Sequence, residues 1–321
     1  MPHRYELLSV LGEGGMGKVY RARHRGLDKL VALKVLDPRL AKHNELMRNA
    51  ERFDREARAI ARLDHPHCVR IYDHAAGFIA MELIEGPTLG AVIDDLGQLP
   101  LARVLAIADD LLGALAHAHA HGVLHRDLKP DNVMLAKRGA VIIDFGLAAL
   151  DDAVAKLTRE GMALGTPAYL APERLRGYPH DARSDLYAVG VMLYEMIAGM
   201  KPYVGSTREE VMHNALARPP RPLRVLRPDI PPALDDIIMR ALAKDPARRF
   251  TDAEDMRFAL AGVDPVIDPV IGPVIGPVAQ SPSTSGSTMI ELALVRPSAW
   301  ARLWSWLRYG KWRWRHRTVT G

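Results

Sequence analysis

The pattern of hydrophobic and polar positions changes near residue 84. Before that point it predicts mainly short strands, and the stretch LVALKVL, residues 30–36, has the apolar content of one. One helix is expected to interrupt these strands, because apolar residues recur there at three- and four-residue steps. The residues in these steps are Leu46, Ala50, Phe53, Ala57 and Ile60. The first part of the chain is therefore expected to be rich in strands and to contain one helix.

From about residue 88 to residue 262 the pattern is mostly helical. The stretch LARVLAIADDLLGALAHAHAHG, residues 101–122, carries leucine and alanine along one face and ends at Gly122. The stretch DLYAVGVMLYEMIAG, residues 185–199, is apolar on nearly all sides, which predicts a buried helix. A strand-rich part is thus followed by a helix-rich part.

After Gly262 the composition changes. The stretch DPVIDPVIGPVIGPV, residues 264–278, is a four-residue repeat with a proline in each unit. Proline fixes φ and removes a backbone donor, so an extended, semi-rigid spacer is expected here. The stretch AQSPSTSGST that follows is typical of a flexible linker. We therefore expect a Pro- and Ser-rich linker over residues 263–290 and a separate tail over residues 291–321.

Composition places the chain among soluble globular proteins, with 48% hydrophobic and 25% charged residues. The N-terminal stretch has no basic region followed by an apolar core, so no signal peptide is expected. The sequence contains no apolar run of about 18 residues, so no transmembrane helix is expected. The single cysteine, Cys68, cannot form an internal disulfide. We expect a buried, inert thiol and a reducing, cytoplasmic compartment.

The tail differs from the rest of the chain in charge and in aromatic content. From Leu292 onward it has no acidic residue and seven basic ones: Arg296, Arg302, Arg308, Lys311, Arg313, Arg315 and Arg317. Subtracting +7 from the formal net charge of +5 leaves −2 for the rest of the chain. All five tryptophans lie in the tail as well.

Three roles fit this tail. Trp300, Leu303, Trp304 and Leu307 follow the spacing of one helix face, and cations flank them, as in a peripheral anchor on an anionic membrane surface. Such an anchor would place the protein at the inner face of the membrane. A disordered basic tail is the second role. Binding to single-stranded nucleic acid is the third and the least favoured.

A glycine-rich loop lies near the N-terminus. The stretch LGEGGMGKV places Gly12, Gly14 and Gly17 in G-x-G-x-x-G register. A dinucleotide-binding loop needs the last glycine to open a helix, and a Walker A loop needs Ser or Thr where this chain has Val19. The residues that follow favour a strand, which leaves a phosphate-covering loop between two strands or a simple glycine-rich hairpin turn.

Lys34 closes an otherwise apolar strand, where a buried unpaired charge would be costly. Glu56 comes three residues after Phe53 and four before Ile60, beside the apolar face of the expected helix. We therefore predict a Lys34–Glu56 ion pair. A glutamate on the exposed side of the helix is the alternative.

A polar cluster, HRDLKPDN at residues 125–132, precedes the apolar segment VMLA. DFG follows at residues 144–146 and APE at residues 171–173. With the glycine loop, Lys34 and Glu56, these motifs resemble in order and spacing those of a eukaryotic-type (Hanks-type) bacterial serine/threonine protein kinase. The resemblance runs from residue 5 to about residue 260.

The resemblance implies the bilobal α+β protein kinase fold over residues 1–262. Its N-lobe, residues 1–84, would be rich in β-structure and contain one key helix, and its C-lobe, residues 85–262, would be mainly helical. The activity implied is ATP- and magnesium-dependent transfer of the γ-phosphate to Ser and Thr hydroxyls of protein substrates. Mn²⁺ is the alternative metal.

Site residues follow from the same resemblance. Asp127 would act as the catalytic base, and Lys129, Lys34 and Glu56 would complete the catalytic set. Asn132 and Asp144 would hold the metal ion, because hard cations take oxygen ligands. The residues implied in nucleotide binding are Leu11, Gly12, Glu13, Gly14, Gly15, Gly17, Val19, Ala32, Lys34, Met81, Glu82 and Ile84.

Supporting residues are implied as well. Asp185 resembles the buried aspartate that braces the catalytic loop, and Glu173 and Arg249 resemble a buried ion pair of the family. Between Phe145 and Leu170 the hydroxyl-bearing residues are Thr158, Thr166 and Tyr169. Thr166 resembles a threonine that bonds the catalytic residues. This leaves Thr158 as the expected autophosphorylation site.

Two other functions are alternatives to a protein kinase: a catalytically inactive scaffold and a kinase for small molecules. No catalytic group is missing from the motifs, and GTPAYLAPE, residues 165–173, resembles a platform for protein substrates. His117 and His121 lie four residues apart, as two metal ligands on one helix would. No third ligand is evident, so surface histidines are favoured. Dimerisation and the physiological substrate stay open.

Overall fold

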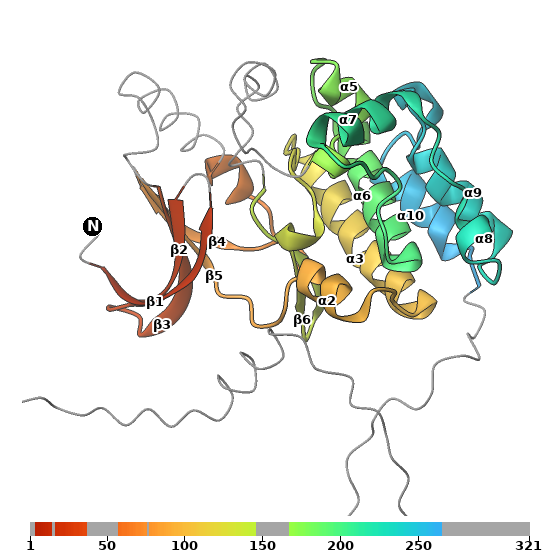
Figure 1. Ribbon diagram of the computed structural model, residues 1–321. Coiled ribbons are helices and arrows are strands. Elements are labelled where there is room, and N and C mark those ends of the chain that lie inside the picture. Colours follow the sequence, from red (N-terminus) through yellow and green to blue (C-terminus); the bar gives the residue numbers. More distant parts are fainter. Residues whose placement is uncertain (1–3, 15–16, 37–56, 76, 146–166, 265–321) are drawn as a thin grey trace, which may run out of the picture. The chain divides into compact units, whose positions relative to one another are not determined.

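The computed structural model describes residues 4–14, 17–36, 57–75, 77–145 and 167–264 (Figure 1). The chain divides into two compact units, Met1–Val270 and Ile271–Gly321, and all described residues belong to the first.

Among the described residues, five strands form one antiparallel sheet in the order β1-β2-β3-β5-β4 (Figure 1). The strands are β1 (Tyr5–Gly14), β2 (Gly17–His24), β3 (Lys29–Leu36), β4 (Ile71–Ala75) and β5 (Phe78–Glu82). The strand-rich first part that the sequence predicts is therefore confirmed.

Side-chain alternation along β3 decides which residues face the rest of the unit. Val31 and Leu33 are buried in a small cluster on one face of the sheet, with Tyr5 and Phe78. Ala32 points to the opposite face and belongs to the main hydrophobic core. Lys34, two residues further on, lies on the same face as Ala32, which directs its ammonium group toward the rest of the unit.

The second part is mainly helical (Figure 1). Its α-helices are α2 (Leu89–Leu96), α3 (Leu101–Ala120), α5 (Pro172–Leu175), α6 (Ala182–Ala198), α7 (Arg208–Ala217), α8 (Leu223–Leu226), α9 (Pro232–Ala241) and α10 (Ala253–Ala261). Short 3₁₀ turns are η2 (Pro130–Asn132), η3 (Pro167–Tyr169) and η4 (Pro246–Arg248). A β-hairpin of β6 (Val133–Ala136) and β7 (Gly139–Ile142) is paired antiparallel.

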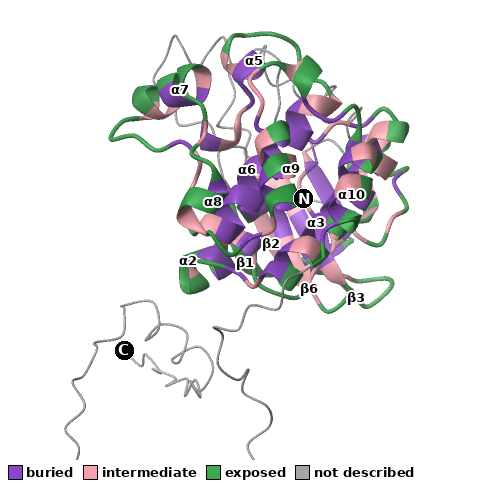
Figure 2. Ribbon diagram, turned by 90° about the vertical axis from the view of Figure 1, so that its right-hand side faces the viewer, coloured by how far each residue is buried: buried purple, intermediate pink, exposed green. Residues whose placement is uncertain are grey.

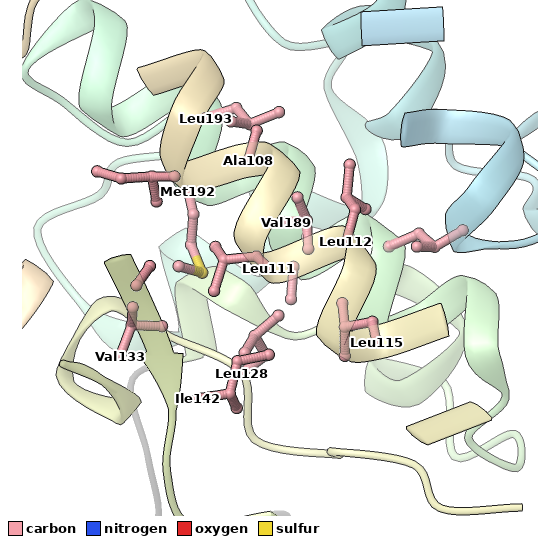
Figure 3. Packing of buried hydrophobic residues seen from close by; sticks show 14 of the residues in the cluster. Ala108, Leu111, Leu112, Leu115, Leu128, Val133, Ile142, Val189, Met192 and Leu193 are labelled. Atoms are coloured by element: carbon pink, nitrogen blue, oxygen red, sulfur yellow. The ribbon is translucent and has the colours of Figure 1, made fainter. Parts of the chain in front are cut away.

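Helix α6 is buried along nearly its whole length, as its apolar sequence predicts (Figure 2). It packs against α3 and the β6–β7 hairpin, and Leu111, Leu115, Val133, Ile142 and Met192 meet in this core (Figure 3). Asp181 caps its first turn by accepting a hydrogen bond from the backbone of Ser184, and Gly199 ends it in the left-handed region at φ 70°. These contacts fix α6 beneath the loop that carries the polar motif.

The long helix predicted over residues 101–122 is confirmed as α3, which ends before Gly122 at φ 72°. The helix expected around residues 46–60 is described only at residues 57–60, which are helical. Cys68 is buried as expected, and burial raises the pKa of its thiol to about 12. Across the described ranges, no helix has the length and apolar character needed to span a membrane.

Candidate active site

The polar loop at residues 125–132 is held from below by one carboxylate. Asp185, on buried helix α6, accepts hydrogen bonds from the backbone amides of His125 at 2.9 Å and Arg126 at 3.0 Å. Arg126 has a left-handed backbone at φ 67°, which is uncommon for a non-glycine residue and concentrates at functional sites. The bracing role expected for Asp185 is therefore confirmed by its contacts.

Two histidines complete the surroundings of Asp185. His119 Nε2 and His180 Nε2 each lie 2.9 Å from one of its oxygens. Burial by itself would raise the pKa of Asp185, but His180 and His119 hold this pKa well below its usual range. The carboxylate of Asp185 is thus ionised, and both of its oxygens have hydrogen-bond partners, which fixes the position of the loop. Neither histidine was assigned this role from the sequence. The contact between His119 and Asp185 spans 66 positions, and no local pattern indicates a pairing at that separation.

Asp127 forms the centre of a compact polar cluster. Its Oδ2 accepts hydrogen bonds from Lys129 Nζ at 2.8 Å and from Asn132 Nδ2 at 3.1 Å. Asn132 Nδ2 also donates to the backbone oxygen of Asp127 at 2.7 Å. The side chain of Asp127 keeps 35% of its surface exposed, whereas Asn132 is buried. A carboxylate oriented by two neighbours and still accessible is suited to accept a proton from a bound hydroxyl.

Lys34 meets Asp144 rather than standing alone. Lys34 Nζ donates to Asp144 Oδ1 at 2.8 Å, and both side chains are largely withdrawn from solvent. This contact joins β3 to the residues after β7 and was not foreseen from the sequence. The signal available in the sequence was the cost of an unpaired lysine within an otherwise apolar strand. Glu56, the partner predicted for it, lies outside the described residues, so that ion pair stays a prediction.

The segment that carries Asp144 lies directly beside the polar loop. Ile143 donates from its backbone to Asn132 O at 2.9 Å, and its own oxygen lies 3.1 Å from His125 Nε2. The rings of His125 and Phe145 are 5.0 Å apart. Asp144 itself has a left-handed backbone at φ 57°. Two strained positions, Arg126 and Asp144, therefore present their side chains from neighbouring loops.

The glycine loop belongs to a β-hairpin. β1 and β2 pair with Gly12 opposite Val19 and Gly14 opposite Gly17, and Val19 stands opposite Lys34 in β3. A side chain at Gly12 would meet no atom within 4 Å, so the space on that side is open. The strands expected on both sides of the glycine loop are confirmed, whereas Gly15 lies outside the described residues.

Further predicted nucleotide contacts line the strands behind this loop. Met81 in β5 is paired with Ala32 in β3, and both are buried. Leu11 is 50% exposed, Glu13 bonds Lys18 at 2.5 Å, and Ile84 is half-buried after the end of β5. The side chain of Glu82 points away into a contact with Arg138. The predicted residues thus lie on the β1–β2 hairpin, on the neighbouring strands β3 and β5, and in the segment that follows β5.

The donor set fits a magnesium ion that shares its ligands with phosphate groups. Asn132 and Asp144 offer oxygen, and Mg²⁺ is usually held by one or two protein oxygens together with substrate phosphates. In the described part of the chain, no group of three or more His, Cys, Asp or Glu side chains is arranged to hold a metal ion. Lys34 and Lys129 place positive charge beside these donors, through their pairs with Asp144 and Asp127.

His117 and His121 are engaged in local contacts. His117 Nε2 accepts a hydrogen bond from the backbone of Asp64 at 3.3 Å. His121 Nδ1 lies 2.8 Å from His117 O, and the two rings are 4.4 Å apart. These contacts occupy one nitrogen of each ring and favour a structural role.

A buried ion pair lies below the platform at residues 167–173. Arg249 donates to both oxygens of Glu173, at 2.8 Å and 2.6 Å, and Ser184 Oγ adds a bond at 2.7 Å. This confirms the expected Glu173–Arg249 pair. Thr158 and Thr166 lie outside the described residues, and the predictions made for them are not described by the structure.

The sequence matches the protein kinase domain family over residues 5–259. Serine/threonine-protein kinase pkn3 of Myxococcus xanthus is 41% identical over 277 residues, which cover 82% of this chain and 50% of that protein. The DNA damage-responsive serine/threonine-protein kinase RqkA of Deinococcus radiodurans is 44% identical over 256 residues, covering 77% of this chain and 37% of that protein. The chain thus spans half or less of the length of these two relatives.

Solved structures resemble the fold as well. The crystal structure of the Mycobacterium tuberculosis PknI kinase domain gives a TM-score of 0.64 at 34% identity, covering 81% of this chain and 95% of that one. A Rad53 structure in complex with AMP-PNP gives a TM-score of 0.65 at 26% identity, covering 79% of this chain and 64% of that one.

Proposed function

The chain belongs to the protein kinase family and has its bilobal α+β fold, and on this basis we propose that it is an active serine/threonine protein kinase. The observation that carries the proposal is the meeting of two polar groups: the cluster of Asp127, Lys129 and Asn132, and the Lys34–Asp144 pair beside it. Relatives that are named serine/threonine-protein kinases support the hydroxyl specificity.

Asp127 is proposed as the base that accepts the proton of the substrate hydroxyl. Lys129, 2.8 Å from it, is placed to neutralise charge on the transferred phosphoryl group. Lys34 would hold the α- and β-phosphates, with Glu56 as its further partner. Phosphoryl transfer mainly requires positioning and charge neutralisation from a protein, and these residues would supply both.

The nucleotide is proposed to be ATP, and the metal ion Mg²⁺ bound by Asn132 and Asp144. The fit of hard oxygen donors and the use of ATP and divalent ions by this family support both. Adenine would bond to the backbone of Glu82 and Ile84 beside Met81, beneath Val19 and Ala32, with the glycine loop over the phosphates. Mn²⁺ has the same preference for oxygen and is the alternative ion.

The proposal is tested by incubating the full-length chain with γ-labelled ATP, Mg²⁺ and a generic basic protein. Label on phosphoserine and phosphothreonine is expected, and it disappears when a chelator removes the metal. Replacing Mg²⁺ by Mn²⁺ in parallel decides between the ions. Binding of ATP without transfer to any protein would identify the chain as an inactive scaffold. Transfer to a small molecule but to no protein would identify the other alternative.

Autophosphorylation is proposed at Thr158. Thr166 has a proposed structural role and Tyr169 donates its hydroxyl to Glu195 Oε2 at 2.5 Å, so Thr158 is the proposed target by elimination. A phosphate there would pair with Arg126 and order the loop. Mass spectrometry after incubation with ATP should detect phosphate on Thr158 first. Thr158→Ala should lower the activity, and full activity in this variant would contradict the proposal.

The tail is proposed to anchor the chain on an anionic membrane surface. The proposal is supported by tryptophan and leucine on one predicted helix face and by the excess of basic residues, each contributing about 1 kcal/mol near an anionic surface. Tryptophan prefers the membrane interface. The protein would then act at the inner face of the membrane. This segment lies outside the described residues, so the proposal depends on sequence alone.

Vesicle sedimentation tests the anchor. The full-length chain should pellet with anionic vesicles and less with neutral ones, while a chain ending at Gly262 should stay in the supernatant with both. High salt should weaken the binding, because the electrostatic part is screened. Equal behaviour of the two chains would exclude the anchor, and binding to single-stranded nucleic acid would then be measured on the same pair.

A further inference from the structure

Arg138 lies in the turn of the β6–β7 hairpin, between Ala136 and Gly139, which are paired across the hairpin end. It is not part of any motif in the sequence. Its side chain nevertheless reaches the end of β5, 56 positions earlier in the chain. Glu82 is the last residue of β5, where the sheet gives way to the segment leading to α2.

The contact with Glu82 is bidentate. Arg138 Nη1 lies 2.5 Å from Glu82 Oε1, and Nη2 lies 2.8 Å from Oε2. Two parallel N–H···O bonds fix the relative orientation of the two groups as well as their distance. The carboxylate is 18% exposed, so solvent screens this pair less than an ordinary surface pair. The bond to Glu82 is also the largest cause of the raised pKa of Arg138.

The same guanidinium holds a second segment. Arg138 Nε donates to the backbone oxygen of Pro66 at 2.7 Å, in the loop that precedes β4. This loop is itself fastened to β7, because Ile142 donates to His67 O at 2.8 Å and Val69 donates to Ile142 O at 3.0 Å. The side chain of Arg138 therefore binds both the end of β5 and the loop that precedes β4.

Glu82 both contacts Arg138 and belongs to the proposed nucleotide site. Its backbone is a proposed contact of adenine, and Met81 before it is another proposed contact. The amide of Glu82 is engaged by Arg70 O at 2.8 Å, and its side chain is held by Arg138. The position of Glu82 relative to the C-lobe is thus set from behind, by a residue that would not touch the nucleotide.

We propose that Arg138 is a positioning residue for nucleotide binding, which holds Glu82 and Pro66 so that the connection between the lobes presents its backbone to adenine. The effect on ATP binding rests on the proposed function, whereas the contacts of Arg138 do not depend on it. The clamp itself, defined as Arg138 with Glu82 and Pro66, orders the apo protein. Its effect on ATP would follow from that order, because binding to a preformed site costs less ordering.

The first experiment measures kinetics in the full-length chain with Arg138→Gln, with Glu82→Gln and with both substitutions. Each single change should raise KM for ATP about five-fold, the size expected for losing one well-oriented ion pair. The double change should raise it by no more than the single ones, since both remove the same contact. The value of kcat and KM for the protein substrate should stay within about two-fold.

Arg257→Gln is the matched control. Arg257 is as exposed as Arg138, at 39% against 38%, and also bonds a carboxylate through two nitrogens, Asp109 at 2.6 Å and 3.2 Å. It joins α10 to α3, away from the sheet exit. Its replacement should leave KM for ATP unchanged. If Arg138→Gln does not fold, Arg138→Lys keeps the charge without the bidentate geometry and should show the same rise.

A second experiment separates the clamp from the proposed function. Without nucleotide, amide hydrogen exchange at residues 67–69 and 82–84 should be faster in Arg138→Gln than in the wild type, and unchanged in Arg257→Gln. Faster exchange in a chain that never transfers phosphate would retain the clamp and refute the kinase proposal. Unchanged exchange in Arg138→Gln would overturn the clamp. In an active chain, an unchanged KM for ATP, multiplicative effects in the double variant, or the same rise in Arg257→Gln would overturn the positioning role of Arg138.

Discussion

Replacing Asp127 by asparagine should reduce phosphoryl transfer by about 10²–10⁴-fold while leaving the protein folded, since a positioned general base contributes an effect of this size. The amide has the shape of the carboxylate but cannot accept the proton of the hydroxyl. It would also lose the charge-assisted bond from Lys129, now 2.8 Å long. The core does not depend on Asp127, whose side chain is 35% exposed.

The measurement is a turnover assay with saturating ATP and Mg²⁺, paired with a melting curve. Asp131→Asn is the matched control, because Asp131 lies four residues further along the same loop and is exposed. That variant should keep most of the activity. Near wild-type turnover in Asp127→Asn would show that another group is the base. A lower melting temperature would instead assign the loss to folding.

The second large effect is on stability. Arg249→Met should lower the free energy of unfolding by about 3–5 kcal/mol, because removing one partner of a buried ion pair leaves an uncompensated charge. Glu173 and Arg249 are both buried and share two short hydrogen bonds. Methionine fills much of the volume but cannot satisfy the carboxylate. The melting temperature should fall by roughly 10 °C for a domain of this size.

The loss should depend on pH in a defined direction. Burial would raise the pKa of Glu173, but the bonds from Arg249 hold it below its ordinary value of 4.5. The carboxylate therefore contributes stability above pH 4.5 that is lost as the pH falls through the folded-state pKa. In Arg249→Met only the bond from Ser184 and a backbone hydrogen bond still oppose the effect of burial, so the pKa of Glu173 rises and the carboxyl takes up a proton more readily. The difference in the free energy of unfolding between wild type and Arg249→Met should be largest near neutral pH and should become smaller as the pH falls.

Arg257→Met serves as the control for this experiment too, since its pair with Asp109 is exposed. An exposed ion pair contributes about 0–1 kcal/mol, so its loss should be small by comparison. Chemical denaturation at several pH values measures all three chains. A loss in Arg249→Met no greater than in Arg257→Met would contradict a structural role for the buried pair.

Secondary structure was largely determined by the sequence alone. The apolar stretch around Lys34 predicted a strand, and β3 places Ala32 and Lys34 on one face as strand alternation requires. The apolar run at residues 185–199 predicted a buried helix, and α6 is buried. These features depend on neighbours a few residues apart, so the chain itself carries them.

Family motifs added partners that periodicity could not. The ion pair of Glu173 and Arg249 joins residues 76 positions apart, and the bracing of the catalytic loop by Asp185 spans 60. Both were expected from resemblance and both are present. The metal and nucleotide roles rest on the same resemblance and on the positions of Asn132, Asp144 and Asp127.

Only the tertiary structure decided how the remaining charges are paired. Lys34 bonds Asp144 at a separation of 110 positions, and Arg138 bonds Glu82 at 56. His180, in the loop before α6, reaches the same carboxylate as His119. Charged side chains follow no period, and each has many acceptable partners of opposite charge. The choice among them is made by the path of the chain and by which surfaces the hydrophobic core brings together.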